Sequence, residues 1–192
     1  MRKQIIFTAI VSLCSFGMID SNQITDNLTD TEINVVDLLK EKEEEKLKIE
    51  QYHKLELENF LYAIGHREST NRYDVVNPWG YMGRYQFGKS TLRTLGYKVT
   101  RKEFLSNHSL QEEAMLSLLQ HNQYSLKYYI KTYEGQNIWG VNITESGLLA
   151  AAHLAGSGNV IKFFDKGSDF ADANGTKMTF YMKQFGGYRL NI

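Results

Sequence analysis

Three short segments of the sequence carry residue types that could cleave a glycosidic bond. Glu68 follows an apolar helical pattern, and a Gly-rich aromatic loop (residues 80–87) and a small-residue segment (residues 151–158) follow it. A carboxylic acid among apolar side chains keeps its proton available, and a glycosidic oxygen must be protonated before it leaves. The sequence therefore predicts Glu68 as a general acid and base, beside a wall that contacts a saccharide.

Tyrosines of the loop are the candidates for that wall. A tyrosine ring stacks on the apolar face of a sugar while its hydroxyl forms hydrogen bonds. We expect Tyr73, Tyr81 and Tyr85 to line the groove. His153 could bind a sugar or the Glu68 carboxyl, but it stands beside Ala and Leu, so a core position is the competing interpretation.

The order and spacing of these motifs resemble those of the soluble lytic transglycosylases and the goose-type lysozymes. In that family a Glu-Ser pair ends a helix, a Gly-Leu-Met-Gln loop follows, and an Ala-Tyr-Asn-Ala-Gly segment completes the groove. The corresponding segments, within about residues 60–164, are Glu68-Ser69, Gly83-Arg84-Tyr85-Gln86 and Ala152-His153-Leu154-Ala155-Gly156. The resemblance implies an acid and base role for Glu68 and substrate contacts for Ser69 and Gln86. It also implies that Gly156 lets its helix pack closely against the helix that carries Glu68.

Two departures from the family pattern affect the expected specificity. Arg84-Tyr85 replaces Leu-Met, and His153-Leu154 replaces Tyr-Asn. Leu154 cannot form the hydrogen bonds of the asparagine that it replaces. A non-catalytic glycan-binding or assembly module of the same fold is therefore the main alternative to an enzyme. A toxin or phage-derived lysin with the same chemistry is a third interpretation.

A second carboxylate would decide between two reaction types. A hydrolase needs one about 5 to 9.5 Å from the first, depending on whether it retains or inverts configuration. Asp74 is the candidate, although an aspartate in a loop often only holds a turn. Without a second carboxylate, the N-acetyl group and C6 hydroxyl of the sugar take part, and the family resemblance implies a 1,6-anhydro product. We expect this second outcome, with peptidoglycan glycan strands as the substrate and the bond from N-acetylmuramic acid to N-acetylglucosamine as the target.

The composition argues against other functions. Lys and Arg number 22, as do Asp and Glu, so the chain has no basic excess and nucleic-acid binding is not expected. The five histidines lack metal-ligand spacing, and we expect neither a metal nor another cofactor. Lys89-Ser90 has the wrong offset for a phosphate-binding loop.

The N-terminus has the pattern of an export signal. Arg2 and Lys3 precede an apolar run over residues 5–19, which is shorter than the roughly 20 residues that span a bilayer. We predict a signal peptide at residues 1–21 and a protein exported to the periplasm or cell envelope, or secreted. Cys14, the single cysteine, follows Leu13 and not a small residue, so a lipid anchor there is not expected.

The segment after the signal is polar and then charged. Apolar residues recur at loosely helical spacing around a run of Lys and Glu at residues 40–46. We expect one or two helices from about Asp37 to Arg67, with the charges forming a solvated face. A protein partner bound through residues 35–58 is the alternative. Residues 22–58 are assigned to this segment and residues 59–192 to the lysozyme-like domain.

The fold class expected for the domain is mainly α. Residues 69–88 hold the only proline and predict a loop or short hairpin after the catalytic helix. Capping and periodicity signals predict further helices that begin near Ser90, Thr100, Ser109, Thr144 and Thr176. Because strands and helices do not alternate, we expect a lysozyme-like helical domain and no parallel sheet.

Overall fold

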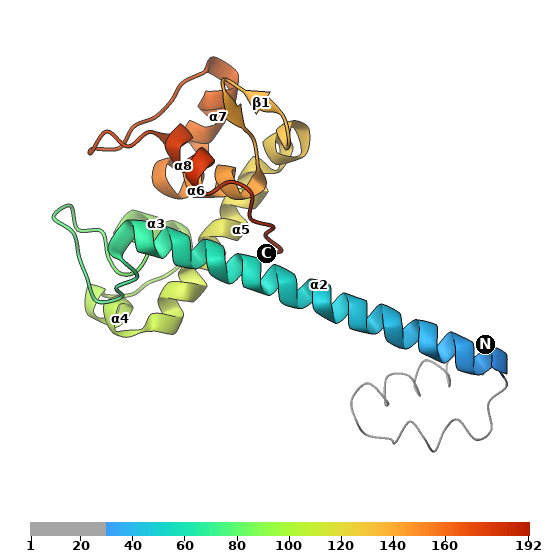
Figure 1. The fold of residues 1–192 in the computed structure, drawn as a ribbon. Helices are drawn as coiled ribbons and strands as arrows, with labels where there is room; N and C mark the ends of the chain where they lie inside the picture. The colour runs from blue at the N-terminus through green and yellow to red at the C-terminus, as the bar shows by residue number, and fades with distance from the viewer. Residues whose placement is uncertain (1–29) are drawn as a thin grey trace. The chain divides into compact units, whose positions relative to one another are not determined.

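The computed structural model describes residues 30–192 (Figure 1). The predicted signal peptide at residues 1–21 and Cys14 lie outside the described residues. The chain divides into two compact units, one ending at Tyr52 and the other comprising His53–Ile192. Sequence analysis placed this division at residues 58 and 59. The candidate site belongs to the second unit.

The first described helix, α2 (Asp30–Ser69), is one continuous helix of 40 residues. It extends beyond both ends of the predicted helical region. The charged run at residues 40–46 is exposed, as expected of a solvated face. From Phe60 onward the helix buries an apolar side, with Phe60 and Ile64 fully buried. Within residues 30–192, no helix combines the length and the apolar character required to cross a membrane.

The second unit is built from short helices around one long one. They are α3 (Lys89–Thr94), α4 (Arg101–Ser106), α5 (His108–Tyr133), α6 (Glu145–Ala155), α7 (Ser157–Lys166) and α8 (Met178–Gln184). The strands β1 (Asn137–Ile138) and β2 (Val141–Asn142) pair antiparallel. The mainly α class is confirmed. Residues 70–88 have no helix and are joined by isolated bridges of Met82 to Val76 and to Phe87, in agreement with the predicted loop or hairpin.

Two clusters of buried side chains form the core on either side of α5. α3 and α4 lie on one side of it, and α6, α7 and α8 lie on the other (Figure 1). The first cluster joins the C-terminal turns of α2 to the 70–88 loop, α3 and α4. The second joins the β hairpin to α7. α5, α6 and α8 contribute side chains to both clusters, so they couple the two halves of the unit.

Capping signals located some helix starts correctly. The Thr144 side chain accepts a hydrogen bond from the Gly147 N–H and begins α6. Thr100 begins α4 with a complete capping box, in which Thr100 and Glu103 bond each other's backbone N–H groups. Both satisfy N–H groups that the first helical turn leaves unpaired.

Two predicted caps are wrong. Asn107, and not Ser109, begins α5, because its side chain already accepts a hydrogen bond from the Leu110 N–H. α8 begins at Met178 with Lys177 as its N-cap, and not at Thr176. An aspartate outside the helix supplies the missing acceptor at α8, since Asp169 accepts from both the N–H and the hydroxyl of Thr179.

The small residues of α6 pack against a different helix from the one expected. A Cβ atom at Gly147 would lie 2.6 Å from the carbonyl oxygen of Met182, so α6 approaches the α8 backbone closely at this point. Gly156 has no heavy atom near its Cβ position. It adopts φ +79°, and it makes the turn between α6 and α7. The predicted close-packing role therefore belongs to Gly147, against α8.

We expect Gly147→Ala to lower the free energy of unfolding by about 1 to 3 kcal/mol, because the methyl group would displace the α8 backbone. Gly158→Ala is the matched control, since Gly158 lies in α7 and open space surrounds its Cβ position. This control should be neutral or up to about 1 kcal/mol more stable. Urea denaturation of both variants measures the difference, and equal stabilities would contradict the packing described.

Candidate functional site

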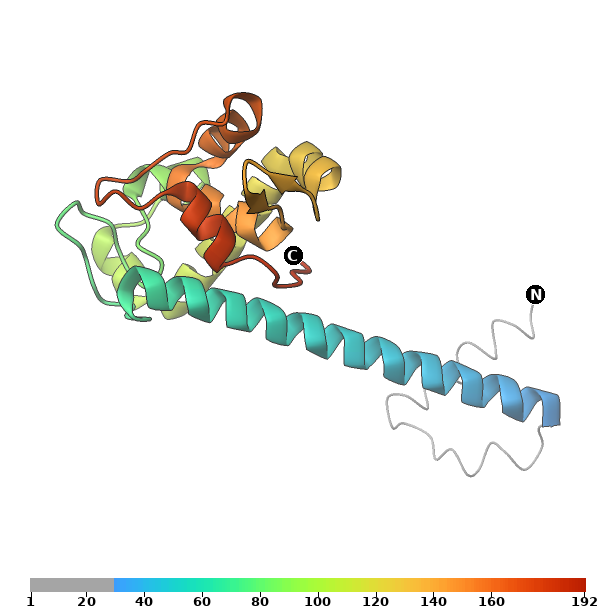
Figure 2. The ribbon, with the colours of Figure 1, turned by 45° about the horizontal axis from the view of Figure 1, so that its top comes forward.

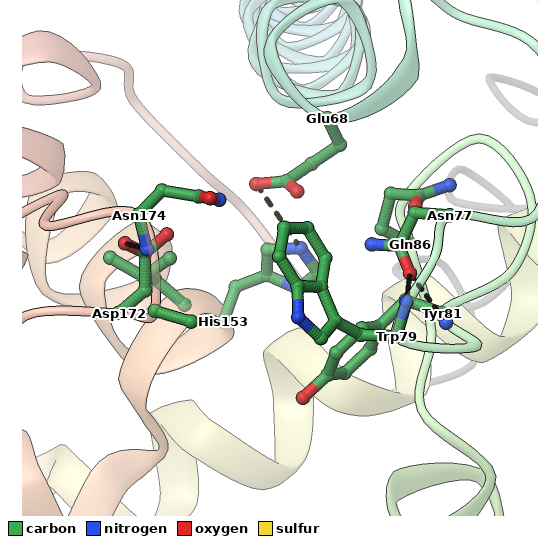
Figure 3. A pocket seen from close by; sticks show the side chains of 10 residues that line it. Glu68, Asn77, Trp79, Tyr81, Gln86, His153, Asp172 and Asn174 are labelled. Carbon is green, nitrogen blue, oxygen red and sulfur yellow. Dashed lines mark hydrogen bonds and ion pairs between the residues drawn. The ribbon is translucent and has the colours of Figure 1, made fainter.

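A cavity of about 300 Å³ opens within the second unit, beside the end of α2 (Figure 3). Its walls come from the end of α2, the 70–88 loop, the end of α6 and the segment between α7 and α8. The lining residues are Glu68, Asn77, Trp79, Tyr81, Gln86, His153, Leu154, Asp172, Ala173 and Asn174. Aromatic rings and side-chain amides predominate. This combination suits a polar ligand with apolar faces.

Glu68 occupies the last turn of α2, and its side chain is only 16% exposed. The Tyr181 hydroxyl donates a hydrogen bond of 2.6 Å to its Oε1 atom. Burial, followed by the negative charge of Glu68, raises the pKa of Tyr181, so the phenol remains a donor. Figure 2 shows α8, which carries Tyr181, beside the C-terminal end of α2. Sequence analysis missed Tyr181 because 113 residues separate it from Glu68.

A left-handed turn ends α2 directly after Ser69, the residue that follows Glu68. Thr70 and Asn71 have φ values of +55° and +60°, and their N–H groups bond to the carbonyls of His66 and Gly65. This pattern stops the helix and directs the chain into the loop. Glu68 is thereby fixed at the mouth of the loop.

Arg84 and Glu112 form the centre of a hydrogen-bond network that holds the loop to α5. Arg84 Nη1 lies 2.9 Å from Glu112 Oε1 and 2.9 Å from the Tyr73 hydroxyl. Arg84 Nε also donates to Asn71 Oδ1. The hydroxyls of Tyr73 and Tyr85 donate to the two oxygens of Glu112, at 2.7 and 2.6 Å. Burial raises the pKa of Tyr85, with Glu112 acting in the same direction, so this hydroxyl stays protonated.

This network changes the roles expected for three predicted substrate contacts. Tyr85 is fully buried, and the Tyr73 ring stacks on His108 at a centroid distance of 4.1 Å. The Ser69 hydroxyl is buried and donates to the Arg84 carbonyl at 2.8 Å. Their polar atoms are used inside the protein, and none of the three lines the cavity. Ser69, Tyr73 and Tyr85 therefore shape the loop and do not form its sugar-facing wall.

Other predicted site residues do reach the cavity. Glu68, Tyr81, Gln86 and His153 all line it. Gln86 is held at φ +51° while its Nε2 donates to the Gly83 carbonyl. Sequence analysis missed Asn77 and Trp79, which lie in the same loop. The Asn77 side chain accepts from the N–H groups of Trp79 and Tyr81, so it forms the turn that presents both rings.

Asp74 does not line the cavity, whereas Asp172 does. Asp74 is exposed in the loop. Asp172 belongs to a short hairpin closed by a bridge between Ala171 and Lys177. Its Oδ1 accepts from the N–H groups of Asn174 and Thr176, at 2.9 and 2.7 Å. Among the lining residues, the carboxylate beside Glu68 is therefore Asp172, and not Asp74 as expected.

His153 lies next to the acid. Its side chain is 7% exposed, and Nε2 is 3.9 Å from Glu68 Oε1. Burial lowers the pKa of His153, whereas the charge of Glu68 acts in the opposite direction. The imidazole is therefore neutral at neutral pH. Among residues 30–192, no three His, Cys, Asp or Glu side chains gather as ligands for a metal ion.

Glu112→Ala should lower the free energy of unfolding by about 2 to 4 kcal/mol, because it leaves the mostly buried Arg84 guanidinium without its anion. Glu113→Ala, at the next and exposed position of α5, should change stability by less than about 0.5 kcal/mol. Thermal unfolding of the two variants tests this difference. Similar losses in both would show that the network does not hold the loop.

The low pKa of His153 predicts a pH dependence of stability. The unfolded chain takes up a proton at this histidine as the pH falls through about 6.5, whereas the folded chain stays neutral. The free energy of unfolding should therefore fall between about pH 7.5 and 5.5, and His153→Gln should flatten that slope. His121→Gln, at an exposed position, should leave the slope unchanged. Identical slopes in the wild type and His153→Gln would contradict the prediction.

Comparisons with family models, with curated proteins and with solved structures found no match to this chain.

Proposed function

We propose that the second unit cleaves peptidoglycan as a lytic transglycosylase of lysozyme-like fold. The proposed target is the β-1,4 bond between N-acetylmuramic acid and N-acetylglucosamine. One observation carries the proposal: the mostly buried Glu68 carboxyl, bonded by Tyr181, faces a cavity lined by rings and amides. The motif order found in the sequence supports the same reaction.

Glu68 would act first as an acid and then as a base. It gives a proton to the glycosidic oxygen, and the bond from C1 to that oxygen breaks. The substrate's N-acetyl carbonyl supports the positive charge at C1. The C6 hydroxyl then adds to C1 and returns its proton to Glu68, which closes the 1,6-anhydro ring. Tyr181 holds Oε1 in place and stabilises the carboxylate between the two proton transfers.

The cavity walls offer suitable contacts for an N-acetylated sugar. Trp79 and Tyr81 are 60% and 47% exposed, so their faces are free to stack on a sugar ring. The side-chain amides of Asn77, Gln86 and Asn174 also line the cavity, where they can bond hydroxyl and acetamido groups. Leu154 offers no such bond, and the other amides supply the polar contacts in its place.

A hydrolase is the second candidate, and Asp172 favours it. A carboxylate that lines the same cavity as Glu68 could activate a water molecule. Against this role, Asp172 already accepts two backbone hydrogen bonds within its own turn. We therefore favour the anhydro product. Export to the cell envelope completes the proposal, and a protein partner bound through residues 35–58 is the alternative to a solvated face for that segment.

Glu68→Gln should reduce cleavage of purified peptidoglycan by about 10² to 10⁴-fold without changing the fold, because an amide cannot donate an acidic proton. Mass spectrometry of the released muropeptides measures both rate and product. Tyr181→Phe should cause a smaller loss, and Glu113→Gln is the control with wild-type activity.

The products separate the candidates. Anhydro-muropeptides from the wild type alone support the lytic transglycosylase. Muropeptides with reducing ends would identify a hydrolase, with Asp172 as the candidate second carboxylate. If neither the wild type nor any variant released a product, the proposal of an enzyme would be contradicted. A glycan-binding module would then be the remaining interpretation.

A further inference from the structure

The ionisable side chains that line the cavity carry negative charge or none. They are Glu68, Asp172, Tyr81 and His153, and no lysine or arginine is among the lining residues. The imidazole of His153 is neutral because it is buried. Even when Glu68 holds its catalytic proton, Asp172 leaves one negative charge in the cavity.

The Asp172 carboxylate is held in a fixed position. Its Oδ1 accepts the N–H groups of Asn174 and Thr176, and the hairpin around it is closed by a turn at Gly175, whose φ is +78°. A carboxylate fixed in this way cannot swing away from a ligand. Asn174, which makes the same turn, lines the cavity beside it (Figure 3).

Two basic side chains that adjoin these elements in the sequence, Arg67 next to Glu68 and Lys177 at the end of the hairpin, have other partners. The Arg67 guanidinium lies 5.3 Å from the centroid of the Phe180 ring. Lys177 Nζ lies 3.8 Å from Asp169 Oδ2. Neither lines the cavity, so the charge of Asp172 is not neutralised where a sugar would bind.

We propose that Asp172 makes the site selective for muramic acid whose lactyl group is capped as a neutral amide, over muramic acid with a free lactyl carboxylate. This inference rests on the proposed function. A lactyl group joined to a stem peptide is a neutral amide, whereas removal of the peptide leaves a free carboxylate. That carboxylate would be repelled by the Asp172 carboxylate in the same cavity. The enzyme would therefore act on peptide-bearing strands before their peptides are removed.

The test compares two polymers that differ only in this charge. Glycan strands stripped of peptides by an amidase carry free lactyl carboxylates, and coupling to methylamine converts these to neutral amides. The full-length protein should cleave the methylamide strands about tenfold faster, as kcat/KM, at low salt. The ratio should shrink as salt rises.

Asp172→Asn should reduce that ratio to about twofold or less, because asparagine keeps the turn's hydrogen bonds but loses the charge. Asp74→Asn is the matched control, an exposed loop aspartate outside the cavity, and should retain the wild-type ratio. Calorimetric binding of both polymers to the Glu68→Gln variant gives a second readout, with the same preference expected.

Equal cleavage of the two polymers by the wild type would overturn the inference while leaving the proposed function intact. A tenfold ratio that persists in Asp172→Asn would overturn it as well. Absence of cleavage of both polymers would overturn the proposed function and the inference that rests on it.

Discussion

The Glu112 carboxylate accepts hydrogen bonds from Arg84, Tyr73 and Tyr85 and so fastens an irregular loop to the longest helix of the unit. The loop has too little regular structure to hold its own shape, and its polar groups would be costly to bury without partners. In this network, the single Glu112 carboxylate accepts hydrogen bonds from three side chains of the loop. Once the loop is fixed, Trp79, Tyr81 and Gln86 lie along the cavity opposite the hairpin of Asp172. Arg84 and Tyr85 thus join the loop to α5 through charge and hydrogen bonds.

The site also depends on the close approach of α8 to α2 and α6. Gly147 lets α6 reach the α8 backbone, and Phe185, directly after α8, packs edge-on against Phe60 of α2 with ring centroids 6.5 Å apart. This packing places the Tyr181 hydroxyl within hydrogen-bond distance of the Glu68 carboxyl. A carboxyl so little exposed needs a hydrogen-bond donor whenever it is ionised. Tyr181 meets that need with a neutral hydroxyl donor.

Local signals in the sequence predicted much of the fold and part of the site. Helical periodicity, the Thr100 and Thr144 caps and the polar 69–88 loop depend on neighbouring residues, so they can be recognised in the sequence. Contacts between residues far apart in the sequence cannot be recognised in this way. Glu112 was not recognised as the partner of the loop, and Tyr85 was expected to line the groove but is buried. Tyr181 and Asp172 were missed because their partners lie far away or in their own turn, where no motif announces a role in the cavity.

The residues that line the cavity come from early and late parts of the second unit. Their order along the sequence determines when the cavity can form during biosynthesis. Glu68 is made early, but the hairpin of Asp172 and the Tyr181 donor come within the last part of the chain. Tyr181 lies in α8, whose backbone α6 approaches closely at Gly147. A chain still emerging from the ribosome therefore contains the acid without its hydrogen-bond partner or its second wall. The complete cavity can therefore form only after the whole unit has been synthesised.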